Sequence, residues 1–255
     1  MAAYGLPALY ALFVWWFTTG AILYLDGLPR HTFRWSMFAA TALALLALIG
    51  LDRSCESTTV AGAYCAFTCA IIIWGWVEIS FLMGFVTGPR TSAAPVGCSE
   101  WRRFVFAIQA IAYHELAIVF AAGSIALLSS GAPNQVGLWT FLILWAMRLS
   151  AKLNLFLGVR NLGEEFLPER LRYLRSFFVK RPMNLLFPIS VTVATILAAI
   201  LWTEATATSA SAFDATGLAL AAALLSLAIL EHWFMVLPMP TTALWSWGLG
   251  SRTPR

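Results

Sequence analysis

The chain has 255 residues, of which 60% are hydrophobic and only 11% are charged, and its mean hydropathy is +0.79. These values exclude an ordinary soluble domain, in which apolar residues make up about half of the chain and charged residues about a quarter. The net charge of +4 is spread over many connections, so it does not indicate a nucleic-acid partner. We therefore expect an all-α, polytopic membrane helical bundle whose main partner is the lipid bilayer.

In chain order, seven apolar stretches are long enough to cross a bilayer, which requires about 20 helical residues. The first has no basic segment before it and no small-residue cleavage site after it, so we expect it to remain as a span. The second is short, and the third is longer than a bilayer requires, which predicts a tilted or projecting helix. Together they predict a single membrane domain over residues 1–255, with spans at approximately 4–25, 35–51, 58–88, 103–129, 136–159, 184–203 and 212–237.

The charges between these stretches predict the orientation of the chain. If the N-terminus is placed on one side, the connections on that side contain one basic residue, Arg53, and those on the other side contain thirteen. Lys and Arg concentrate in the cytoplasmic connections of membrane proteins. We therefore expect a multi-pass inner-membrane protein with a periplasmic N-terminus and a cytoplasmic C-terminus.

The longest connection, between residues 160 and 183, contains a different kind of element. Pro168 suits the first position of a helix, and Leu171, Leu174 and Phe177 follow at helical spacing, with basic residues between them. This pattern predicts an amphipathic helix over approximately 168–181 that lies in the cytoplasmic membrane interface.

Ionisable residues inside the spans are the strongest candidates for a site, because an unpaired charge at bilayer depth costs several kcal/mol. Once the orientation is set, these residues lie at similar depths and could form one polar layer. Arg148 and Lys152 are one helical turn apart and therefore share a face of the fifth span. With the amide of Asn154, the candidates are Glu78, His114, Glu115, Arg148, Lys152, Asn154, Glu231 and His232.

Three interpretations of this layer stay open. In the first, Arg148 and Lys152 form buried ion pairs with the three carboxylates and hold the helices in register. In the second, a transition metal is bound by Glu78, His114, Glu115, Glu231 and His232. Adjacent helical residues point about 100° apart, and the Glu-x-x-His spacing of di-metal bundles is missing, which both count against it.

In the third interpretation, one imidazole is the axial ligand to the magnesium of a bacteriochlorophyll-type pigment. This role requires only a neutral nitrogen that faces an apolar slot. A histidine within a membrane is also commonly hydrogen-bonded to a neighbouring helix.

Several long, colinear strings carry a resemblance to a known family. They include WWFTTGAILYLDGLPRHTFRW at 15–35, WGWVEISFLMG at 74–84, TGPR at 87–90, YHELAI at 113–118, MRLSAKLNLFLGV at 147–159, RPMNLLFP at 181–188 and LEHWF at 230–234. Together these strings resemble the photosynthetic complex assembly protein 2 family, also called PuhE-like, of anoxygenic phototrophic bacteria. The resemblance extends over essentially the whole chain.

The resemblance implies an inner-membrane or intracytoplasmic-membrane protein that affects assembly of the photosynthetic reaction centre and light-harvesting apparatus, or the supply of bacteriochlorophyll. Reaction-centre or light-harvesting subunits and the pigment are its implied partners. A second hypothesis is a membrane-embedded, metal-dependent oxidoreductase that acts on a lipid-soluble pigment precursor or a quinone. A transporter is third, because the sequence shows no inverted repeat and no paired breaks in its spans.

Overall fold

The computed structural model describes residues 2–239 and 241–252, and its long elements are all α-helices. Seven of the described helices are long and apolar enough to cross a membrane. The predicted all-α class with seven membrane helices is thus confirmed. The helices are α1 (Ala2–Asp26), α2 (Phe33–Ser54), α3 (Val60–Leu82), α4 (Glu100–Leu128), α5 (Val136–Leu157), α6 (Leu186–Ala205) and α7 (Ala212–Phe234).

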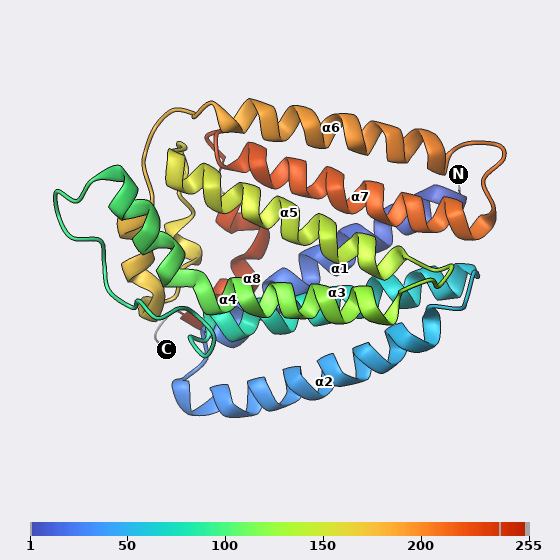
Figure 1. The fold of residues 1–255 in the computed structure, drawn as a ribbon, viewed down its shortest axis with the longest axis horizontal. Helices are drawn as coiled ribbons and strands as arrows, with labels where there is room; N and C mark the ends of the chain where they lie inside the picture. The colour runs from blue at the N-terminus through green and yellow to red at the C-terminus, as the bar shows by residue number, and fades with distance from the viewer. Residues whose placement is uncertain (1, 240, 253–255) are drawn as a thin grey trace.

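Two of the helices form the centre of the bundle. About two thirds of the most apolar stretch of α3 is buried (67%), and 61% of that of α7, against 28% or less for the other five helices. Phe67 and Ile71 of α3 pack against Leu220 and Leu224 of α7. Figure 1 shows α2 and α6 at opposite edges of the bundle. Small residues dominate α7, which allows neighbouring helices to approach closely.

The connections define two ends of the bundle. Residues 55–59, 129–135 and 206–211 form short connections at one end (Figure 1). The connections 27–32, 83–99 and 158–185 lie at the other end, which we call the basic end because most Lys and Arg residues between the helices lie there. Five of the eight predicted candidates lie in the halves of α5 and α7 nearer to this end: Arg148, Lys152, Asn154, Glu231 and His232.

Helix α3 ends at Leu82, earlier than the predicted boundary at 88. Gly84 adopts a φ of +80°, and its N–H donates to the carbonyl of Phe81, which terminates the helix. The following loop then binds α4 directly: the N–H of His114 donates to the carbonyl of Thr87 at 2.9 Å. Helix α4 is bent in its basic-end half (Figure 1), and the loop after α3 contacts it at His114.

The element predicted at 168–181 is a 3₁₀ helix, η3 (Glu169–Phe177). Residues three apart align along one side of a 3₁₀ helix, so Leu171, Leu174 and Phe177 form a single apolar row. This row is buried against Phe81 and Ala110 of the bundle. The apolar side of the element is therefore covered by protein, not only by the membrane interface as the pattern predicted.

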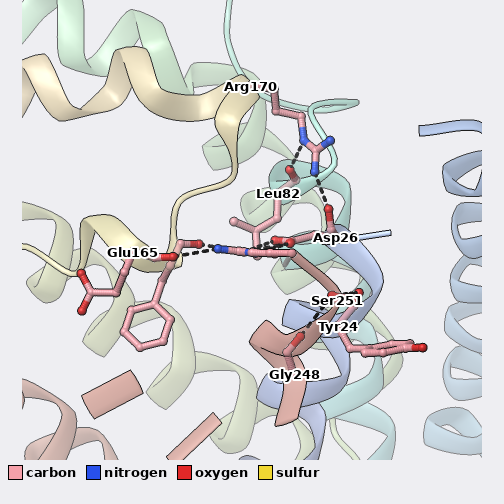
Figure 2. A network of polar contacts seen from close by, with 9 residues as sticks. Tyr24, Asp26, Leu82, Glu165, Arg170, Gly248 and Ser251 are labelled. Atoms are coloured by element: carbon pink, nitrogen blue, oxygen red, sulfur yellow. Dashed lines mark hydrogen bonds and ion pairs between the residues drawn. The ribbon is translucent and has the colours of Figure 1, made fainter. Parts of the chain in front are cut away.

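The segment after α7 folds back along α1, which the sequence did not predict. It contains η4 (Thr241–Trp245), α8 (Ser246–Leu249) and η5 (Gly250–Arg252). The indole N–H of Trp245 donates to the carbonyl of Trp16 at 3.1 Å. The guanidinium of Arg252 donates to both carboxylate oxygens of Asp26 at 2.8 and 2.9 Å, beside a hydrogen bond from Ser251 to the carbonyl of Tyr24 (Figure 2).

Candidate functional site

A cavity of about 440 Å³ lies among α1, α3, α5 and α7 and extends to the loop after α5. Its walls are mainly apolar and include aromatic side chains of the C-terminal segment and of η3. A predominantly apolar cavity with a few polar groups is typical of small-molecule sites. The predicted candidates that line it are Glu78, Arg148, Lys152, Glu231 and His232.

The first polar group joins α3, α4 and α5. A guanidinium nitrogen of Arg148, Nη2, donates to Oε2 of Glu78 at 2.9 Å, and Nε2 of His114 lies 3.8 Å from Oε1. The side chain of Glu78 is only 9% exposed, whereas that of Arg148 is 41% exposed and lines the cavity. Oε1 of Glu78 has no hydrogen-bond partner among the described residues. The pair therefore holds a buried carboxylate beside the cavity.

The imidazole of His114 is fully buried. Its ring lies against the ring of Phe81, with centroids 4.4 Å apart. Neither of its nitrogens has a hydrogen-bond partner within the described residues, and His114 is not part of the cavity wall. This histidine thus lies behind Glu78 and Phe81, which both line the cavity.

The second polar group joins α4 to α5 through a single contact. Nζ of Lys152 donates to Oε1 of Glu115 at 2.5 Å. Both side chains are mostly buried, and Lys152 also lines the cavity. Arg148 and Lys152 share one face of α5, and each pairs with a carboxylate of a different helix. Glu231, the third carboxylate of the ion-pairing interpretation, has no cationic partner among the described residues.

The third polar group joins α7 to α1 and α5. The indole N–H of Trp15 donates to Oε1 of Glu231 at 2.8 Å. The Nδ1 of His232 lies 2.9 Å from the carbonyl of Ala228, and its Nε2 lies 2.9 Å from the hydroxyl of Ser150. Since a carbonyl only accepts, Nδ1 carries the proton and Nε2 accepts from the hydroxyl.

Asn154 has a different position from the other candidates. It is fully buried, and its side-chain oxygen accepts from the amide of Asn184 at 3.0 Å. The oxygen of Asn184 in turn accepts from the N–H of Leu186, at the start of α6. These contacts connect the end of α5 to the start of α6, so Asn154 supports the fold beside the cavity and does not line it.

The five donors predicted for a metal do not converge. No group of three or more His, Cys, Asp or Glu side chains within residues 2–239 and 241–252 could hold a metal ion. Glu115 is paired with Lys152, and Glu231 is bonded to Trp15. This arrangement offers no ligand set for the metal-dependent oxidoreductase hypothesis.

The histidines also differ from the arrangement that an axial pigment ligand requires. His232 lines the cavity, but both of its ring nitrogens are engaged. His114 has two nitrogens without partners, but it lies behind Glu78, outside the cavity wall. The Lys and Arg side chains that line this cavity are Arg148 and Lys152, and both present N–H donors.

Two residues of the site were not found from the sequence. Trp15 lines the cavity and donates its indole N–H to Glu231. Asn161 also lines the cavity, and its amide donates to the carbonyl of Phe234 at 2.8 Å, which caps the end of α7. Neither position has a local sequence signal, because its partner lies more than 70 residues away.

The family model described as "Protein of unknown function (DUF3623)" matches residues 1–255. The chain belongs to the DUF3623 family. A relative from Rhodobacter capsulatus is 41% identical over 252 residues, which cover 96% of this chain and 91% of the relative. That relative is named "Uncharacterized 30.4 kDa protein in puhA 5'region". No solved structure significantly matches this DUF3623 chain.

Proposed function

We propose that this DUF3623 protein is an inner-membrane assembly factor for the bacterial photosynthetic reaction centre or light-harvesting apparatus, and that it holds a bacteriochlorophyll-type pigment during assembly. It resides in the inner or intracytoplasmic photosynthetic membrane, with the basic end in the cytoplasm. The process is supported by the name of the Rhodobacter capsulatus relative, which places that protein beside puhA, and by the resemblance to the PuhE-like family.

The observation that carries the proposed role is the cavity within the bundle. Its walls are mainly apolar, as required for the ring and the hydrocarbon tail of a lipid-soluble pigment. Arg148 and Lys152 reach the same cavity with N–H donors that suit the carbonyl groups on the edge of such a ring. His114 lies outside the cavity wall, and both ring nitrogens of His232 are already hydrogen-bonded. The proposal therefore assigns pigment recognition to the apolar walls and to these donors, with no histidine ligand to the magnesium.

The experiment compares pigment retention by two glycine variants purified from pigmented phototrophic cells. Gly75 lines the cavity, and a Cβ built there meets only Ile22 Cδ1, at 3.9 Å. Gly75→Leu therefore fills cavity space without a backbone clash. Gly123→Leu is the matched control, because this exposed helical glycine has no neighbour within 4 Å of its Cβ.

The wild type and Gly123→Leu are expected to co-purify with the pigment, measured by its near-infrared absorbance against protein, and Gly75→Leu is expected to lose it. Cells with Gly75→Leu as their sole copy should also contain fewer reaction-centre complexes. A colourless wild-type protein, together with normal complexes in cells that carry Gly75→Leu, would contradict the proposal.

A further inference from the structure

A second pocket, separate from the cavity, opens at the basic end. It has a volume of about 570 Å³ and lies between the start of α2, the loop after α3 and η3. The residues of this pocket that can carry positive charge or donate hydrogen bonds come from all three segments: Arg30, His31, Arg34, Thr87, Thr91, Arg170 and Tyr173. No Asp or Glu side chain lines it. The pocket therefore concentrates positive charge on a concave surface.

Two of these arginines have no acidic partner. Arg30 and Arg34 are exposed, and neither forms an ion pair with any carboxylate in the described part of the chain. Other cations at this end are neutralised locally: Arg172 pairs with Glu169, and Arg252 pairs with Asp26. The start of α2 adds further positive potential, since it has no side-chain cap and no acidic residue in its first turn.

Arg170 is held rigidly in the wall of this pocket. Its Nε donates to the carbonyl of Leu82 at 2.7 Å and its Nη2 to the carbonyl of Asp26 at 2.8 Å (Figure 2). The guanidinium lies over the ring of Phe33, 4.3 Å from its centroid. These contacts leave Nη1 without an acceptor among residues 2–239 and 241–252. A planar, pre-oriented guanidinium with free N–H groups matches a phosphate or carboxylate.

The electrostatic environment of Arg170 also favours an anion. Burial lowers the pKa of Arg170 below its ordinary value; the charge of Asp26 raises this pKa, and the nearby positive charges of Arg30 and Arg252 lower it. An anion in the pocket would offset the repulsion between Arg30 and Arg170. Like charges gathered without counter-charges are costly unless a ligand neutralises them.

From this geometry we propose that the pocket binds a phosphate group, carried by an anionic phospholipid headgroup or by a soluble phosphate. The proposal is independent of pigment binding. The surroundings fit a lipid: Phe85 in the pocket wall and Trp35 and Phe38 on the first turns of α2 are 56%, 65% and 72% exposed, as expected for aromatic residues at a membrane surface. Basic pockets at the cytoplasmic ends of membrane helices commonly bind lipid headgroups.

The test uses the full chain and two double variants with equal loss of charge. Arg30→Gln/Arg34→Gln removes the unpaired cations of the pocket. Arg102→Gln/Arg160→Gln is the control, because both residues are exposed, unpaired in the described structure and located at the basic end outside the pocket. Thermal unfolding confirms that each variant folds, and the single variants Arg30→Gln and Arg34→Gln replace the double variant if it does not.

The first measurement is native mass spectrometry after equilibration in nanodiscs of phosphatidylcholine with added phosphatidylglycerol. The second is a calorimetric titration of the detergent-solubilised protein with inorganic phosphate. The wild type and the control are expected to retain phosphatidylglycerol preferentially, and the pocket variant is expected to bind it about tenfold more weakly. Retention of the lipid by the wild type with no response to phosphate identifies the headgroup as the source.

A response of the wild type to inorganic phosphate alone, lost in the pocket variant, supports the site with a soluble phosphate as its ligand. Equal weakening in both double variants would show that only general surface charge acts, and would overturn the proposal. Unchanged binding of both probes by the pocket variant would overturn it as well.

Discussion

Substitution of Arg148 tests whether the buried Glu78 carboxylate requires the Arg148 guanidinium for the stability of the fold. In the structure the Glu78 carboxylate is 9% exposed and its Oε2 receives the Arg148 guanidinium at 2.9 Å. Two other groups that can be cationic act on this carboxylate: His114, whose Nε2 lies 3.8 Å from Oε1, and Lys152, which is already paired with Glu115. Arg148→Gln therefore leaves an inadequately compensated carboxylate inside the bundle, at a cost of about 3–5 kcal/mol.

The reverse substitution should cost less, because the two partners differ in exposure. The side chain of Arg148 is 41% exposed, so after Glu78→Gln the guanidinium can still be hydrated from the cavity. We expect a loss of about 1–2 kcal/mol for Glu78→Gln. The double variant Glu78→Gln/Arg148→Gln contains no unpaired charge and should be more stable than Arg148→Gln alone, by about 1–3 kcal/mol.

The relative stabilities of these three variants are measured by thermal unfolding in detergent micelles, with the loss of monodisperse protein as the readout. For a chain of this size, Arg148→Gln should lower Tm by roughly 6–20 °C. Arg53→Gln is the control, since Arg53 is exposed and has no ion pair within the described residues. Two results would refute this reasoning. One is that Arg148→Gln and Glu78→Gln lower Tm equally, and the other is that the double variant is the least stable of the three. Either would show that the buried Glu78 carboxylate does not require the Arg148 guanidinium more than Arg148 requires Glu78.

Three further predictions concern the basic end. Arg252→Gln leaves the buried Asp26 carboxylate unpaired, so it should cost about 3–5 kcal/mol and expose the C-terminal segment to carboxypeptidase; unchanged digestion would refute the anchoring role. Burial raises the pKa of Tyr173 above its ordinary value of 10.0, so the phenol stabilises the fold below about pH 10 and this contribution is lost as the pH rises through the raised pKa. Tyr173→Phe should be less sensitive to alkaline unfolding than the wild type, and identical pH profiles would contradict this. Gly88→Ala should destabilise the fold by about 2 kcal/mol or more, because its Cβ would lie 2.0 Å from the carbonyl oxygen of Gln109. The exposed Gly123→Ala should instead stabilise α4 by about 0.5–1 kcal/mol, and equal Tm shifts in the two variants would refute the close packing at Gly88.

Local sequence was sufficient to predict the class of the fold and the number of membrane helices. Hydrophobicity over about 20 residues is a property of each segment alone, because a helix in lipid must satisfy its backbone hydrogen bonds internally. The cost of a charge in hydrocarbon singled out seven ionisable side chains. His114 and Glu115 are not part of the cavity wall, and the other five are Glu78, Arg148, Lys152, Glu231 and His232. The structure does bring these five side chains to one cavity.

The choice of partners depended on packing between segments distant in the chain. Nothing near Glu231 in the sequence indicates that Trp15 is its donor, and nothing near Asp26 indicates Arg252. The end of α3 at Leu82 also followed from the loop that binds α4, which hydropathy does not register. Apolar composition specifies that a segment enters the membrane, whereas the direction of each side chain, and therefore each ion pair and each cavity, follows from how the helices pack against one another.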